Sequence, residues 1–141
     1  MSNDEKLQAM LDKFEIAEVV SAACYSRDTS DWSTLRDCYH SDGTVTVSWH
    51  SGPVDEFIER STEMMAKRLP GEFTKHVNAN QRIRLNGNRA IIEYDVILHS
   101  RRMLDGYAFD FHTWSKYLDQ VEKRDGRWKI FNRSAIYEKD R

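Results

Sequence analysis

Five histidines are the side chains of this 141-residue chain best suited to move protons near neutral pH. They are His40, His50, His76, His99 and His112. His76 lies early in one segment of alternating polarity, and His99 lies near the end of the next. If the two segments form an antiparallel pair that turns at residues 86–88, position 76 lies opposite roughly position 98. The two imidazoles then share one face only if a bulge shifts the alternation by one residue.

Asp28 follows the first helical segment and is a carboxylate that could support one of these rings. A carboxylate beside a histidine fixes the ring tautomer and stabilises the imidazolium, which makes the ring a better base. An Asp28–His76 pair would therefore carry out acid–base chemistry in a pocket. A structural alternative stays open, in which His76 is a surface or hydrogen-bonded strand residue and Asp28 caps a helix end.

Other chemical classes lack their sequence signatures. No two histidines stand at the i, i+4 spacing of a zinc protease, no glycine-rich loop joins a strand to a helix, and no Gly-x-Ser-x-Gly motif occurs. Cys24 and Cys38 are too few for a disulfide framework or a zinc site, and Cys24 lies within the first helix, where a core position is expected. The sequence therefore predicts no metal and no cofactor.

The composition is that of a folded domain, with 40% hydrophobic, 31% charged and 11% aromatic residues. A net charge of −2 gives no basic footprint for nucleic acid, and no apolar run approaches the ~20 residues of a membrane-spanning helix. The acidic start is unlike a secretory signal, and two thiols without a framework fit a reducing compartment. We expect one cytoplasmic domain over residues 1–141, with neither nucleic acid nor a membrane as partner.

Three helices are predicted from apolar residues at helical spacing. The first covers residues 3–25 with Asn3 as its N-cap and ends near Asp28. The second covers residues 32–39, and the third is opened by Pro53 and stopped by Pro70-Gly71.

Strands are predicted where the pattern alternates with period two. One short strand covers residues 44–49, and four further strands cover residues 73–85, 89–101, 107–123 and 128–137. Asn-Gly and Asp-Gly turns join the last four as consecutive hairpins. Helices first and hairpins last indicate an α+β fold. Long antiparallel strands must twist into a curved sheet, and a pocket between this sheet and the three helices follows.

The order of these elements, together with two motifs, resembles the SnoaL-like branch of the nuclear transport factor 2-like superfamily. The motifs are the stretch Asp28-Thr-Ser-Asp-Trp-Ser-Thr-Leu35 after the first helix and Asp125-Gly-Arg-Trp-Lys129 before the last strand. The resemblance covers about residues 14–138. It implies a cystatin-like fold, in which a cone-shaped curved sheet, antiparallel or mixed, wraps around N-terminal and inserted helices.

Within that branch the pattern is closest to scytalone dehydratase, with bile acid dehydratases and hexachlorocyclohexane dehydrochlorinase further off. The resemblance implies that His76 is a catalytic base supported by Asp28, that His99 is a second active-site histidine, and that Ser115 is an active-site serine. Arg27 and Trp49 stand where the dehydratase has two tyrosines, Tyr117 stands where it has a substrate-binding asparagine, and Ala23 stands where the dehydrochlorinase has a lysine.

The function expected is cofactor-independent dehydration, isomerisation or elimination on an apolar, cyclic small molecule. The expected pocket residues are mostly aromatic: Phe14, Trp49, Phe57, Met65 and Phe111, with Tyr25, Tyr94 or Tyr117 as a source of a phenol. The alternative is a non-catalytic module of the same fold that binds a hydrophobic small molecule. We also expect a homodimer or homotrimer, because His112, Trp114, Lys116 and Leu118 alternate on one side of a long strand.

Overall fold

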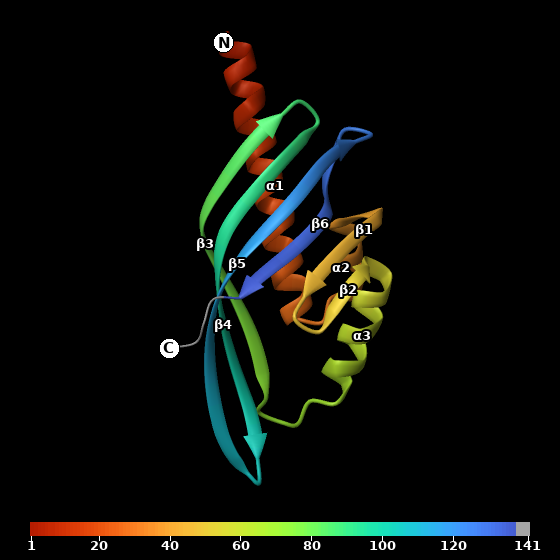
Figure 1. Cartoon of the computed structure of the whole chain (residues 1–141), viewed down its shortest axis with the longest axis vertical. Helices are drawn as coiled ribbons and strands as arrows, with labels where there is room; N and C mark the ends of the chain where they lie inside the picture. The colour runs from red at the N-terminus through yellow and green to blue at the C-terminus, as the bar shows by residue number, and fades with distance from the viewer. Residues whose placement is uncertain (138–141) are drawn as a thin grey trace.

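The computed structural model describes residues 1–137 and shows a curved sheet packed against helices on one face (Figure 1). Helix α1 (Asn3–Asp28), helix α2 (Trp32–Asp37) and helix α3 (Val54–Ala66) form the helical side. The strands are β1 (Tyr39–Val47), β2 (His50–Pro53), β3 (Phe73–Asn86), β4 (Arg89–Leu104), β5 (Tyr107–Arg124) and β6 (Arg127–Tyr137). The expected α+β class and cystatin-like architecture are confirmed.

The six strands run in the order β2-β1-β6-β5-β4-β3, so the three C-terminal hairpins follow one another across the sheet. All neighbours are antiparallel except β1 and β6, which are parallel. The hairpin turns place Gly87, Gly106 and Gly126 at positive φ, as tight two-residue turns require. The turn residues therefore fix the pairing that the sequence predicts.

Three local predictions are wrong in detail. The N-cap of α1 is Ser2, whose hydroxyl accepts a hydrogen bond from the Glu5 amide at 3.1 Å while the Glu5 carboxylate accepts one from the Ser2 amide. Helix α2 ends at Asp37, and strand β1 begins at Tyr39, because Tyr39 already pairs with Ile130 of β6. A short strand β2 also precedes α3, and α3 ends at Ala66, three residues before the end expected.

The core lies between α1 and the inner face of the sheet, which we define as the face that the helices cover. Ile16, Val20 and Ala23 of α1 are buried there. They belong to one cluster with inner-face residues of three strands: Ile92, Tyr94, Val96, Val121 and Ile130. This packing anchors the C-terminal half of α1, and with it Asp28, against the sheet.

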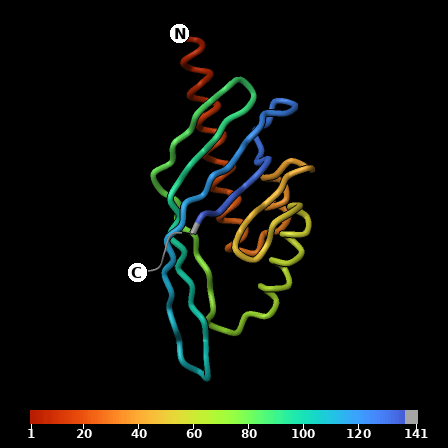
Figure 2. Tube along the Cα trace, in the orientation of Figure 1, coloured from red at the N-terminus to blue at the C-terminus, as the bar shows by residue number. Residues whose placement is uncertain are grey.

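Register decides which side chains reach the inner face near the end of α1. His76 of β3 pairs with Leu98 of β4, and Leu98 pairs with Thr113 of β5. Directly paired residues share a face, so these three side chains form one row on the inner face. Beyond this row, the β4–β5 hairpin extends past the rest of the molecule, as the lower end of Figure 2 shows.

Candidate active site

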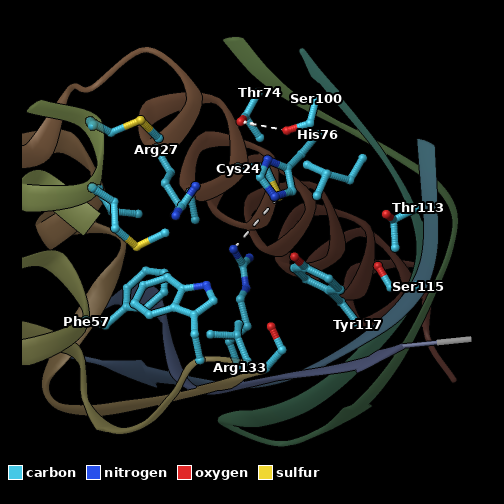
Figure 3. A pocket seen from close by; sticks show the side chains of 18 of the residues that line it. Cys24, Arg27, Phe57, Thr74, His76, Ser100, Thr113, Ser115, Tyr117 and Arg133 are labelled. Carbon is cyan, nitrogen blue, oxygen red and sulfur yellow. Dashed lines mark hydrogen bonds between the residues drawn. The ribbon is translucent and has the colours of Figure 1, made fainter. Parts of the chain in front are cut away.

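A cavity of about 530 Å³ lies between the inner face of the sheet and helices α1 and α3. This volume is within the range of small-molecule sites. The side chains that line it come from all three helices and five strands, and they include Cys24, Arg27, Trp49, Phe57, Met64, Met65, Arg68, Thr74, His76, Leu98, Ser100, Arg102, Thr113, Ser115, Tyr117 and Arg133. Figure 3 shows Thr113, Ser115 and Tyr117 of β5 along one wall of this cavity.

Asp28 and His76 form a close pair at the edge of the cavity. Asp28 Oδ1 lies 2.5 Å from His76 Nδ1, and Asp28 Oδ2 accepts a hydrogen bond from the His76 backbone amide at 2.7 Å. Both side chains are nearly buried, at 10% and 11% exposed. One carboxylate therefore fixes both the position of the strand and the orientation of the ring. The contact expected between these residues is present.

The end of α1 presents Asp28 to β3. Helix α1 stops there because Ser30 adopts φ 58° and Thr29 turns back, its hydroxyl donating to the Tyr25 carbonyl at 2.9 Å. Asp28 is thus the last residue of the helix, and its side chain leaves the helix end toward the neighbouring strand. The same turn leads into Asp31, whose carboxylate accepts a hydrogen bond from the Thr34 amide and caps α2.

The second ring nitrogen of His76, Nε2, has no hydrogen-bond partner within residues 1–137, and the residue lines the cavity. With Nδ1–H donating to a carboxylate, Nε2 carries the lone pair. Figure 3 shows the His76 side chain at the cavity wall. The arrangement can accept a proton from a molecule in the cavity and hold the resulting imidazolium against Asp28.

The expectation that His99 shares this site is wrong. His99 pairs with Lys75, one position away from the pair formed by His76 and Leu98, so it lies on the outer face. There its Nε2 lies 3.1 Å from Asp110, and its ring packs 4.4 Å from the ring of His112. A bulge does exist in β3, between Ala79 and Arg82, and it has the opposite effect. The pairing that starts at Asn86 and Arg89 would place His76 opposite His99, and the extra residue moves His76 opposite Leu98 on the inner face.

Four aromatic residues expected in the pocket lie elsewhere. Tyr25 is 72% exposed, because it lies on the side of α1 that faces away from the sheet. Tyr94 is fully buried in the core, where its hydroxyl donates to Asp119 at 2.8 Å. Phe111 is 51% exposed on the projecting β4–β5 hairpin, and Phe14 is exposed on the half of α1 that precedes the core contacts. None of the four is among the residues of the described chain that line the cavity.

The other residues expected at the pocket line the cavity. Trp49 and Phe57 stack with ring centroids 5.3 Å apart and an interplanar angle of 17°, and Met65 lies on the same side. Ser115 and Tyr117 line the opposite wall on β5, and both are buried. The cavity thus has an aromatic and thioether side and a hydroxyl-bearing side.

Sequence reasoning missed a buried ion pair beneath the cavity. Arg133 donates two hydrogen bonds to Asp119 Oδ2 and one to Oδ1 at 2.8–3.1 Å, and the two side chains are 6% and 0% exposed. The guanidinium lies 5.6 Å from the ring centroid of Tyr117 and contacts Cys24 Sγ, the contact drawn as a dashed line in Figure 3. A bulge after Gln120 sets Asp119 opposite Arg133, so a plain hairpin register would not bring the two together.

Burial governs the remaining ionisable groups near the cavity. It raises the pKa of the Cys24 thiol above its ordinary value and raises that of Cys38 to about 11. Thiols of this kind are poor nucleophiles at neutral pH. Within residues 1–137, no three histidine, cysteine or carboxylate side chains gather as metal ligands, and no helix is long and apolar enough to cross a membrane.

Solved structures share this fold at low sequence identity. A protein of unknown function with a cystatin-like fold from Nostoc punctiforme PCC 73102 is 22% identical over 91% of this chain and 92% of its own, with a TM-score of 0.73. A provisionally named scytalone dehydratase from Novosphingobium aromaticivorans DSM 12444 is 19% identical over 93% and 87%, with a TM-score of 0.79. A hexachlorocyclohexane dehydrochlorinase (LinA) type 2 is 16% identical over 95% and 90%, with a TM-score of 0.75.

At these identities the structural likeness establishes the fold and leaves the reaction open. No curated protein sequence matches the chain significantly. The family model of the SnoaL-like domain, by contrast, matches residues 8–134, which includes the end of α1, the cavity strands and the Asp-Gly turn before β6. The chain therefore belongs to the SnoaL-like domain family.

Proposed function

We propose that this protein is a cofactor-independent enzyme of the dehydratase, isomerase or HX-elimination type, with His76 as base and Asp28 as its support. The observation that carries the proposal is the Asp28–His76 pair, with the Nδ1 side of the ring held at 2.5 Å and Nε2 without a partner within residues 1–137 at the wall of a 530 Å³ cavity. Similar folds that carry dehydratase and dehydrochlorinase names support the reaction class by analogy.

The chemistry starts with a C–H bond next to a carbonyl or an aromatic system. His76 Nε2 takes the proton, and the electron pair of that bond forms an enolate or a new C=C bond as the leaving group departs with its own pair. Asp28 stabilises the imidazolium formed in this step, because its charge is held against Nδ1–H in a nearly buried site. The imidazolium can return this proton to another carbon, which completes an isomerisation, or a second group can supply a proton to the leaving group.

Tyr117 is the donor that the geometry supports best. Its side chain lines the cavity on β5, where Ser115 and Thr113 also present hydroxyls (Figure 3). The Tyr117 side chain is buried, and its ring centroid lies 5.6 Å from the Arg133 guanidinium, so the phenol is held in place at the cavity wall. His99, which the family resemblance implies as a second active-site histidine, lies on the outer face and so is not the donor in this proposal.

The test is turnover of a panel of cyclic β-hydroxy-ketones and alkyl halides by the wild-type protein and by His76→Ala. A positioned base contributes about 10²–10⁴-fold, so the variant should lose about that much in kcat/KM. His112→Ala removes an imidazole from the outer face and serves as the matched control, with kcat/KM expected within twofold. Circular dichroism and thermal melting check that both variants fold. Wild-type rates in folded His76→Ala would remove His76 from the mechanism.

A second function, a non-catalytic binding module, is favoured by one specific feature. Arg27 and Trp49 stand where the dehydratase pattern has two tyrosines, and the Arg27 guanidinium lies 5.8 Å from the Trp49 ring centroid. This cation–π pair suits binding and supplies no proton relay. Tight binding of panel members with no turnover by the wild-type protein would support the binding module and refute the enzyme.

A further inference from the structure

The charged residues that line the cavity are all of one sign. They are Arg27, Lys67, Arg68, Arg102 and Arg133, and no carboxylate side chain of residues 1–137 lines it with them. The chain as a whole carries a net charge of −2, so this concentration of positive charge is local to the cavity.

Arg133 does not contribute free positive charge, because Asp119 neutralises it within the core. The other four cations come from three separate elements. Arg27 lies in the last turn of α1, Lys67 and Arg68 follow the end of α3, and Arg102 lies on β4 where the projecting hairpin begins. The positive charge therefore surrounds the end of the cavity where α1, α3 and the hairpin approach one another.

Neither Arg68 nor Arg102 forms a direct salt bridge within residues 1–137. The two oxygens of Glu72 accept hydrogen bonds from the backbone amides of Leu69 and Met103, both at 2.9 Å. These bonds lower the pKa of Glu72, and the charges of Arg102 and Arg68 lower it further from a distance. Burial lowers the pKa of the Arg68 guanidinium, the charges of Arg27 and Arg102 lower it further, and the charges of Asp28 and Glu72 offset this only in part. A bound anion next to Arg68 and Arg102 would stabilise these partly desolvated guanidinium groups.

An aromatic surface lies next to these cations. Trp49 and Phe57 stack on each other, and the Arg27 guanidinium lies 5.8 Å from the Trp49 centroid and 5.6 Å from the Phe57 centroid. Figure 3 shows the Arg27 side chain extending into the cavity on the same side as Phe57. A molecule seated on this surface would place one end near the arginines and the rest toward His76.

We propose that the cavity takes a ring-bearing organic oxyanion, with its ring packed on the Trp49–Phe57 side and its carboxylate or phosphate group held by Arg68 and Arg102 beside Arg27. This inference rests on the proposed function and names the substrate class of that site. Guanidinium groups suit it because their planar fork of donors matches both carboxylate and phosphate oxygens. The same cations would also favour the second negative charge that develops when His76 removes a proton from an anionic substrate.

Binding of three probes with one ring system tests the proposal without any turnover: 2-naphthoate, 2-naphthyl phosphate and the neutral 2-naphthamide. Isothermal titration calorimetry at 50 mM salt should give a Kd for at least one anion about 10-fold or more below that of the amide, as loss of a charge-assisted hydrogen bond predicts. The preferred anion identifies carboxylate or phosphate as the natural group. Raising the salt to 500 mM should weaken the anion and leave the amide nearly unchanged.

Arg68→Gln and Arg102→Gln should each weaken the preferred anion about 10-fold while changing the Kd of the amide by less than twofold. Arg101→Gln is the matched control, because it removes the same charge one position along β4, on the outer face, where Arg101 pairs with Asp110. Its anion Kd should match that of the wild type. Equal affinity for the three probes, or no binding of any of them by the wild-type protein, would overturn the proposal.

The outcome is separable from that of the proposed function. An anion preference that is retained in His76→Ala, together with unchanged turnover by this variant, would support the oxyanion site and refute the base. Loss of turnover in His76→Ala with no anion preference in the wild type would do the reverse.

Discussion

Replacing Asp28 by asparagine should convert His76 from a base into a hydrogen-bond donor toward the cavity. In the wild type, both carboxylate oxygens accept hydrogen bonds from His76, one from Nδ1–H and one from the backbone amide. Asparagine has a single oxygen. If the backbone amide keeps that oxygen, the NH₂ group faces Nδ1, which must then be the unprotonated nitrogen. The proton moves to Nε2, and the lone pair no longer faces the cavity.

The expected magnitude follows from the charge that is lost. With about 4 Å between the centres of carboxylate and imidazolium and an effective dielectric of ~20, the attraction is about 4 kcal/mol. At 1.36 kcal/mol per tenfold change in rate, Asp28→Asn should lower kcat/KM about 10³-fold. Solvent screening of this pair is limited, since its side chains are only 10% and 11% exposed.

Two measurements check this prediction, and one needs no substrate. Nitrogen-15 NMR of histidine-labelled protein should report a proton on Nδ1 of His76 in the wild type and on Nε2 in Asp28→Asn. The second measurement is turnover. Asp110→Asn is the control. Asp110 contacts His99 on the outer face, so this substitution removes an equivalent aspartate–histidine contact far from the cavity. A wild-type His76 protonated on Nε2, or full activity in folded Asp28→Asn, would refute the reasoning.

Three further outcomes are expected. His99→Ala should keep kcat/KM within twofold, since His99 lies on the outer face, and a 10²-fold loss would contradict the register described. Arg133→Met should cost roughly 3–5 kcal/mol of unfolding free energy in urea titrations, because it leaves Asp119 buried without its partner. The Arg133→Met/Asp119→Leu double variant should regain much of that loss. Equal stability of Arg133→Met and wild type would show that the pair is not desolvated. Sedimentation should find a homodimer or homotrimer, and Trp114→Lys should convert it to a monomer. The reason is an exposed apolar patch on the outer face, where Trp114 is 57%, Ile136 55% and Val77 49% exposed. A wild-type monomer would contradict this.

The hairpins were predictable because each is closed by a turn with a strong sequence preference. Asn-Gly and Asp-Gly fix a two-residue loop, and the loop fixes the pairing of every residue that follows until a bulge intervenes. Strand β5, predicted over residues 107–123, is Tyr107–Arg124. The Asn-Gly turn alone would place His76 opposite His99, because Asn86 pairs with Arg89, so the observed pairing of His76 with Leu98 also needs the bulge between Ala79 and Arg82.

Bulges limited the prediction of the site. Bulges have weak sequence signals, yet each one exchanges the faces of all residues beyond it. The bulge in β3 lies between the Asn-Gly turn and His76, so it exchanges the face of His76, which reaches the inner face while His99 stays on the outer face. The bulge at Phe131 in β6, opposite the step from Gln120 to Val121, moves Arg133 opposite Asp119, which creates a buried ion pair that simple alternation would not produce.

Long-range juxtapositions were not contained in any local pattern. Asp28 and His76 are 48 positions apart, and their contact depends on how α1 packs across the sheet. Their pairing was expected from the family resemblance, while spacing alone left a structural alternative open. Arg27, Arg68 and Arg102 come from three separate parts of the chain, and each looks like an ordinary surface arginine in the sequence. Only the assembled fold reveals that they surround one cavity.

The absence of His99 from the cavity bears on which reactions this site can perform. With one imidazole, either the His76 imidazolium gives back the proton that it took, or a second group of another kind donates one. A phenol such as Tyr117 is a weaker acid than an imidazolium, so protonating a departing hydroxide is harder here than releasing a halide, which leaves without a proton. A substrate anion near Arg68 and Arg102 would ease formation of the enolate and reduce the demand on the acid. For the proposed base His76, this arrangement suits isomerisation and HX elimination better than dehydration, and the β-bulge in β3 creates it by separating His99 from His76.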